Sequence, residues 1–133
     1  MATWRDYLRE SRRFREAAEA VYDPEHLNPG LSSIILAAIA ANDALCLALI
    51  GIVPGGESHA RATRELQAAC KGTRHEAEAA KRARQLADVL EQKTTVQYRG
   101  QPVRPDTADR IMKQAQRFID WVEDVLAEEQ PGG

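Results

Sequence analysis

The stretch of sequence that decides the fold is LSSIILAAIAANDALCLALIGI, residues 31–52. It is rich in alanine and leucine, which favour helices, and it is apolar on nearly every side. A helix of this kind must be covered all round, so it predicts the central helix of a bundle or part of an interface between copies. A chain of 133 residues has few other helices to cover it, which predicts a homodimer.

The same stretch is long enough to cross a bilayer. However, Asn42 and Asp43 lie near its middle. An acidic side chain at that depth costs roughly 2.5–3.5 kcal/mol on insertion scales. We therefore interpret the stretch as the spine of a soluble bundle and expect no membrane span.

Helical spacing of apolar residues extends to both sides of this stretch. Four further helices are predicted, over residues 3–22, 59–70, 76–92 and 106–128. Proline, glycine and asparagine interrupt the pattern and predict loops over residues 23–30, 54–57 and 94–104. Thr73 and Glu76 have the spacing of a capping box at the start of the fourth of these five helices.

These elements predict an all-α fold, an up-and-down bundle of about five helices, because short loops favour antiparallel neighbours. The length allows one domain, which we assign to residues 1–128, with a disordered tail over residues 129–133. No run of residues has the alternation of a strand, and no internal repeat is present.

Composition excludes several classes of protein. The net charge of -2 and the pI near 5.9 argue against a protein that coats nucleic acid, although 18 Lys and Arg residues are compatible with a local basic patch. No ligand spacing or cofactor motif is present, so we expect neither a metal nor a cofactor. We expect Cys46 and Cys70 to be buried thiols in a reducing cytoplasm, and the N-terminus lacks the apolar core of a signal peptide.

Asn42 and Asp43 are unusual because they are polar residues within an apolar helix. A buried carboxylate costs several kcal/mol unless it is paired, so Asp43 should meet an Arg, a Lys or a helix terminus. The pair predicts a buried polar network that fixes the register of the helices; a ligand pocket and exposure at the rim are the alternatives. The two residues lie about 100° apart around the helix axis, which argues against a shared pocket.

The segment Gly55 to His59 offers the other local signal. Gly55 and Gly56 precede a helix and predict a turn, with backbone N–H groups for an anion as the alternative. Ser58 is a good N-cap, and His59 follows it. A solvated helix start is one interpretation of His59; a contact with a phosphate or a base, supported by the nearby Arg64, is the other.

The layout as a whole resembles a known family. An amphipathic helix precedes the apolar helix SSIILAAIAANDALCLALIG (32–51), which is followed by GGESH (55–59), LEQKTTVQY (90–98) and AQRF (115–118). Over residues 3–126 this pattern resembles the HEPN family of small prokaryotic helical domains, in particular its minimal form. That form ends the fourth helix with Arg-x-x-Ala-Asp-Tyr.

The resemblance implies a dimeric up-and-down bundle, often encoded beside a nucleotidyltransferase as a toxin–antitoxin pair. Active members cleave RNA without metal, using an Arg and a His four to six residues apart, often with Tyr two residues after the His. With Tyr98 taken as that Tyr, Val96 stands at the His position and residues 89–91 contain no Arg. Lys93 replaces the Arg of the minimal pattern. The resemblance therefore implies a member without the catalytic pair.

From the sequence we expect a catalytically silent binding module rather than an enzyme. Its ligand would be a nucleotide, an RNA or a toxin–antitoxin partner protein of the nucleotidyltransferase type. The ligand-binding residues would be His59, Arg64, Lys93 and Tyr98. Two alternatives remain: a degenerate endoribonuclease or toxin that uses His59, and a helical adaptor that docks a partner protein through an apolar face.

Overall fold

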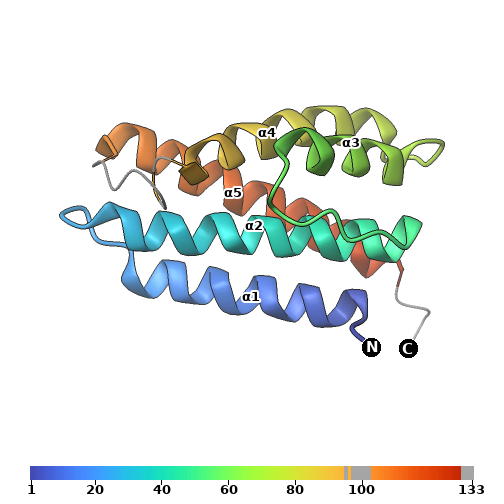
Figure 1. Ribbon diagram of the computed structural model, residues 1–133, viewed down its shortest axis with the longest axis horizontal. Coiled ribbons are helices and arrows are strands. Elements are labelled where there is room, and N and C mark those ends of the chain that lie inside the picture. The colour runs from blue at the N-terminus through green and yellow to red at the C-terminus, as the bar shows by residue number, and fades with distance from the viewer. Residues whose placement is uncertain (95, 97–102, 130–133) are drawn as a thin grey trace.

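The computed structural model describes residues 1–94, 96 and 103–129, and these residues form five α-helices (Figure 1). The helices are α1 (Trp4–Val21), α2 (Leu27–Ile50), α3 (His59–Cys70), α4 (Glu76–Thr94) and α5 (Pro105–Ala127). The all-α bundle of about five helices is therefore confirmed. Tyr98 and residues 130–133, most of the predicted tail, lie outside the described residues.

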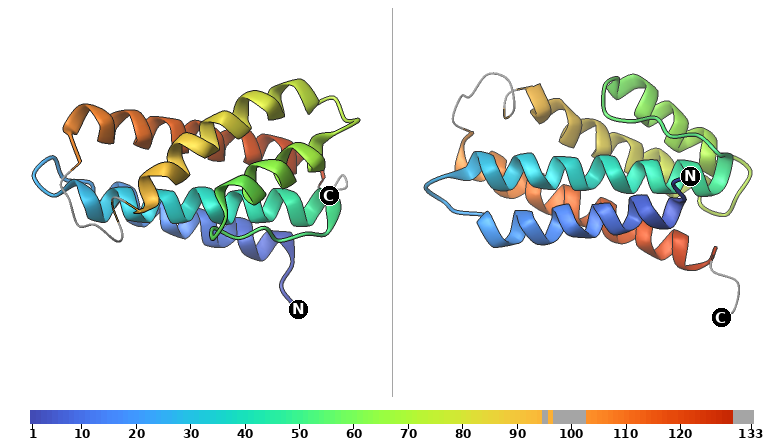
Figure 2. Two further views of the ribbon diagram at one scale, coloured as in Figure 1. Left: turned by 45° about the horizontal axis from the view of Figure 1, so that its top comes forward. Right: turned by 60° about the horizontal axis from the view of Figure 1, so that its bottom comes forward.

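The four long helices, α1, α2, α4 and α5, alternate in direction, and the start of α1 and the end of α5 lie at the same end of the bundle (Figures 1 and 2). The short helix α3 breaks this alternation, because it runs in the same direction as α2. The connection between them, residues 51–58, turns back along α2 before α3 begins; we call it the return loop. The prediction of antiparallel neighbours thus fails at this one connection.

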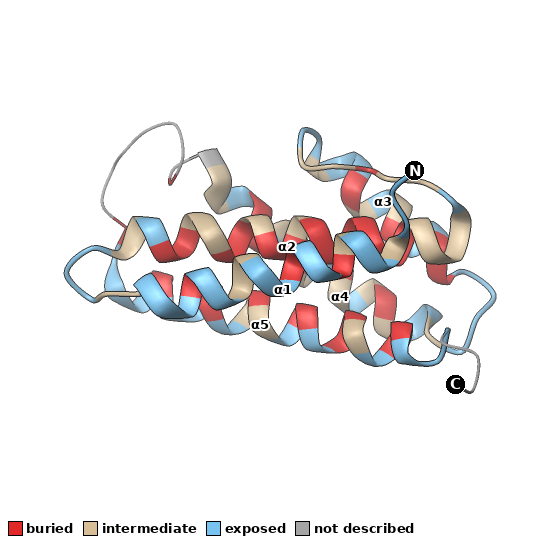
Figure 3. Cartoon of the chain, turned by 90° about the horizontal axis from the view of Figure 1, so that it is seen from below, coloured by how far each residue is buried: buried red, intermediate tan, exposed pale blue. Residues whose placement is uncertain are grey.

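Helix α2 is the spine of the bundle and contacts all four other helices. By length and composition alone α2 is able to cross a membrane, with a mean hydropathy of 2.2, but 61% of that window is buried inside the bundle (Figure 3). This coverage is compatible with a soluble protein. The other helices thus cover much of the surface for which a second copy was expected, and the homodimer stays a prediction.

Helix α2 begins at Leu27, four residues before the predicted start, so the expected turn at residues 28–30 is wrong. Pro29 is the third residue of the helix, where the missing N–H would have no intrahelical acceptor in any case. Gly30 meets the preceding residues closely, since a Cβ there would lie 2.9 Å from Tyr22 Cδ1. The turn is instead closed by the His26 N–H, which donates to the Asp23 carbonyl at 2.9 Å.

The starts of α4 and α5 also differ from the sequence prediction. At α4, Glu76 Oε1 accepts a hydrogen bond from the N–H of Gly72 at 2.8 Å rather than from that of Thr73. Helix α5 begins at Pro105, which was expected to lie before the helix. Proline suits the first helical position because its fixed φ matches the helix.

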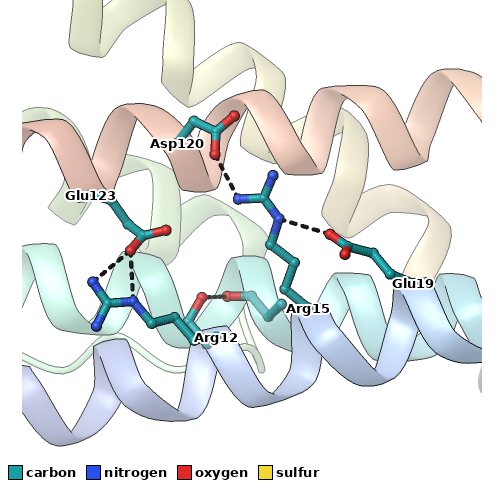
Figure 4. A network of polar contacts seen from close by, with 7 residues as sticks. Arg12, Arg15, Glu19, Asp120 and Glu123 are labelled. Atoms are coloured by element: carbon teal, nitrogen blue, oxygen red, sulfur yellow. Dashed lines mark hydrogen bonds and ion pairs between the residues drawn. The ribbon is translucent and has the colours of Figure 1, made fainter.

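Helix α5 is held from two sides. Its inner face contributes Phe118, which is fully buried and packs near Trp121 with a centroid distance of 6.1 Å. Its other side is clamped to α1 by ion pairs (Figure 4). Arg12 lies 2.7 Å from Glu123, and Arg15 lies 2.6 Å from Asp120 and 3.2 Å from Glu19.

Candidate functional site

The return loop is fixed to α2 by Asp43. The N–H of Gly55 donates to Asp43 Oδ1 at 2.8 Å, and Gly55 takes a φ of +70°, in the left-handed region that favours glycine. The next residue, Gly56, lies so close to α2 that a Cβ would be 2.6 Å from Ile39 Cδ1. The loop amide that was considered as a site for an external anion is therefore occupied by the protein's own carboxylate.

Asn42 is directed to the same segment as Asp43. Its Nδ2 donates to the carbonyl of Ala62 at 3.3 Å, in the first turns of α3. Both side chains are buried, with exposed fractions of 1% for Asn42 and 6% for Asp43. Although they lie about 100° apart on α2, the loop and α3 together are wide enough to meet both. Asn42 thus ties α2 to α3, and Asp43 ties α2 to the return loop. The partner of Asp43 is a backbone amide rather than a side chain.

The environment of Asp43 opposes ionisation. Burial raises the pKa of this carboxyl to about 6, while the hydrogen bond from Gly55 and the charge of Arg61 act in the opposite direction. No ion pair of Asp43 occurs within the described part of the chain. The ionised carboxylate therefore costs stability at neutral pH.

The predicted ligand residues are only partly brought together. Lys93 Nζ donates to the Gly56 carbonyl at 2.9 Å, so this cation pins the return loop from the side of α4. His59, the first residue of α3, follows that loop. Arg64 is exposed, and its place five residues later puts it about 140° around the helix from His59. Lys93 and Asp43 thus act on one structural loop, and Arg64 points away from His59.

The described residues provide little for nucleophilic or acid–base chemistry. Burial raises the pKa of the Cys46 thiol to about 12 and that of Cys70 to about 11, so neither forms a thiolate at neutral pH. His75 Nε2 lies 2.9 Å from Glu128 Oε2, and Arg74 pairs with the same carboxylate, which lowers the pKa of Glu128. In the described part of the chain, no group of three or more His, Cys, Asp and Glu side chains is placed to hold a metal ion.

A different surface carries unused charge. Two hollows of about 450 and 470 Å³ share Arg117; the first lies between α4 and α5, and the second lies on α5 alone. We call them together the α4–α5 groove. The first hollow is lined by Lys81, Arg82, Gln85 and Trp121, and the second by Arg110, Lys113 and Gln114. Asp120 and Asp124 also line the first hollow, and Asp106 and Asp109 also line the second.

The cations of the α4–α5 groove are largely free. Lys81, Arg110, Lys113 and Arg117 form no ion pair with any residue that the structure describes. Several of the carboxylates, in contrast, are engaged: Asp120 with Arg15, Asp106 with Arg104 at 3.3 Å, and Asp109 with the Tyr22 hydroxyl at 2.6 Å. The groove therefore presents free cations, while three of its four carboxylates bond to other partners.

The sequence matches no family, no curated protein matches it, and no solved structure matches the fold. The resemblance to the HEPN family therefore stays a prediction.

Sequence reasoning missed the α4–α5 groove, although a signal was present. Arg110, Lys113 and Arg117 have the spacing i, i+3, i+7, which places them on one face of a helix. Nothing in the sequence showed that their acidic neighbours would bond to α1, because that depends on how α1 and α5 pack.

Proposed function

We propose that this chain is a catalytically silent helical binding module of the cytoplasm, which holds a phosphate-bearing ligand, a nucleotide or an RNA. Its site is the α4–α5 groove rather than the surroundings of His59, Lys93 and Tyr98. The carrying observation is that four cations of the groove form no ion pair within the part of the chain that the structure describes: Lys81, Arg110, Lys113 and Arg117. Arginine and lysine in such a row are the usual ligands of phosphate oxygens.

The absence of catalysis is proposed for a chemical reason. Cleavage of RNA by attack of the 2′-hydroxyl on the adjacent phosphate needs an acid–base group, which raises the rate by about 10²–10⁴-fold. It also needs a cation to stabilise the charged transition state, which contributes about 10²–10³-fold to the rate. Lys93 is already bonded to the Gly56 carbonyl, and lysine lacks the bidentate fork of arginine. His59 has no hydrogen-bonded orienting group among the described residues.

Incubation of the purified chain with structured RNA and tRNA in EDTA is expected to leave both intact. The wild type is compared with His59→Ala and Lys93→Ala. Cleavage that His59→Ala abolishes would contradict the proposal and support the alternative of a degenerate endoribonuclease. Cleavage that survives both substitutions would identify a contaminant.

A second candidate function, docking of another protein, has its own observation. On α2 and the return loop, five partly exposed apolar side chains remain outside the core cluster: Leu36, Leu47, Ile50, Ile52 and Val53. A homodimer or a toxin–antitoxin partner of the nucleotidyltransferase type would use this surface and would leave the α4–α5 groove open. Light scattering at micromolar protein separates a dimer from the 14.8 kDa monomer.

A further inference from the structure

We infer that the α4–α5 groove binds an extended single-stranded nucleic acid, which lies across both hollows and stacks one base on the guanidinium of Arg82. This inference rests on the proposed function and narrows its ligand from a phosphate-bearing group to one class of polymer. Three features of the groove support it, namely its length, its planar platform and its distribution of charge.

The length of the cation row favours a polymer over a mononucleotide. Arg110, Lys113 and Arg117 follow one another along α5, and at 1.5 Å per residue the row extends about 10 Å. Lys81 extends it across the first hollow on the side of α4. Each hollow alone has a volume in the range of a small-ligand site, about 300–1,000 Å³. A single phosphate group reaches only part of this row, whereas successive phosphates of a strand reach all of it.

The first hollow contains a platform for a base. The guanidinium of Arg82 lies over the ring of Trp121, 6.0 Å from its centroid. Arg82 is fixed there by Gln85 at 2.9 Å and by Glu78 at 2.9 Å. The Arg82 side chain is 18% exposed. In this proposal a base stacks on the side of the guanidinium away from Trp121, and such stacking does not depend on the sequence of the strand. An acidic peptide carries charge but no base, so it would leave this platform unused.

The distribution of charge favours a single strand over a duplex. Of the free cations, Lys81 and Arg117 line the hollow between α4 and α5, whereas Arg110 and Lys113 line the hollow on α5. The chain as a whole has a net charge of -2. A duplex holds its phosphates on a wide cylinder, which is too broad to enter the hollow between α4 and α5 where Lys81 and Arg117 lie. A single strand is narrow enough to follow the row of cations.

The test measures the binding of fluorescein-labelled octauridylate by anisotropy at several salt concentrations. Four phosphate contacts predict a slope of log K against log salt near about −2.8, since each contact on a single strand contributes about −0.7. The triple variant Arg110→Gln, Lys113→Gln, Arg117→Gln should bind about 100-fold more weakly at 0.1 M salt and give a slope near about −0.7. If the triple variant folds poorly, Lys113→Gln alone serves instead. It removes one contact and should make the slope shallower, at about −2.1.

A matched control removes three cations from another surface: Arg5→Gln, Arg9→Gln, Arg13→Gln, all exposed on α1. This control should keep the wild-type slope. A platform test uses Trp4→Phe, which leaves Trp121 as the one remaining tryptophan of the two in the chain. Octauridylate should change the Trp121 emission and bind about 5- to 100-fold more tightly than inorganic polyphosphate. Arg82→Lys, which keeps the charge but loses the plane, should abolish that preference.

Each of the following outcomes would overturn one part of the inference. Equal affinity for uridine monophosphate and octauridylate would refute the extended strand and leave the phosphate-binding groove standing. Polyphosphate or an RNA duplex binding as tightly as octauridylate would refute the single-strand class. Equal losses in the groove variant and the α1 control would refute the site. Binding of none of these probes would refute both this inference and the proposed function.

Discussion

Asp43→Asn is expected to stabilise the folded chain by about 1–3 kcal/mol at pH 7.5. The carboxyl is buried and its pKa is raised to about 6, so its ionised form costs up to about 3 kcal/mol relative to the unfolded chain. Asparagine keeps an oxygen that accepts the Gly55 N–H but carries no charge. The stability linked to this carboxyl is complete below pH 3.8 and is lost as the pH rises through about 6.

Urea unfolding of wild type and Asp43→Asn between pH 4 and 8 measures this effect. The difference in the free energy of unfolding should be near zero at pH 4, grow with pH and level off above the pKa of about 6. Glu16→Gln, an exposed carboxylate on α1, is the control and should show no such growth. A difference that does not change with pH, or a loss of stability at pH 7.5, would show that Asp43 is not buried against the return loop.

Phe118→Ala is expected to have the largest effect on stability, a loss of about 3–5 kcal/mol. Phe118 is fully buried, and its removal leaves a cavity beside Trp121 that the surrounding helices cannot fill. Total stabilities of about 5–15 kcal/mol are usual for domains of this size, so the variant should unfold at much lower urea concentration. Phe118→Leu, with a smaller loss, serves if the alanine variant does not fold.

Phe14→Ala makes the same chemical change at a partly exposed position on α1. It should cost less than half as much as Phe118→Ala, because less of the ring leaves water on folding. Equal losses for the two variants would contradict the packing of α5 against the spine of the bundle. The measurement is the midpoint of urea unfolding, compared between variants whose free energy of unfolding depends on urea concentration with the same slope.

The periodicity of apolar residues predicted which segments are helical. It did not predict where α2 and α5 begin or in which direction α3 runs. The burial of α2 followed from its composition alone. Its start did not, because Pro29 signals a break in most contexts and is tolerated only within the first turn of a helix. Pro105 misled in the same way. The direction of α3 depended on Asp43 and Lys93 drawing the return loop back along α2, which no local pattern reveals.

The candidate site was harder to predict than the fold. Lys93 was interpreted as a ligand-binding cation, and the structure uses it to hold the Gly56 carbonyl. Asp43 was expected to meet a side chain or a helix terminus, and it meets a loop amide. The cations of α5 are free of ion pairs within the described residues, whereas their acidic neighbours Asp120 and Asp109 bond to Arg15 and Tyr22. Whether a surface charge is free depends on tertiary neighbours, which the sequence does not display.

The central claim is that the ligand binds between α4 and α5 and not at the return loop. Backbone amide resonances of the ¹⁵N-labelled chain, recorded during titration with octauridylate, test it most directly. We predict that the shifts concentrate at residues 81–85 and 110–121, including the indole N–H of Trp121, while those of residues 55–64 stay in place. Shifts that concentrate at residues 55–64 instead would contradict the account and return the site to His59 and the return loop.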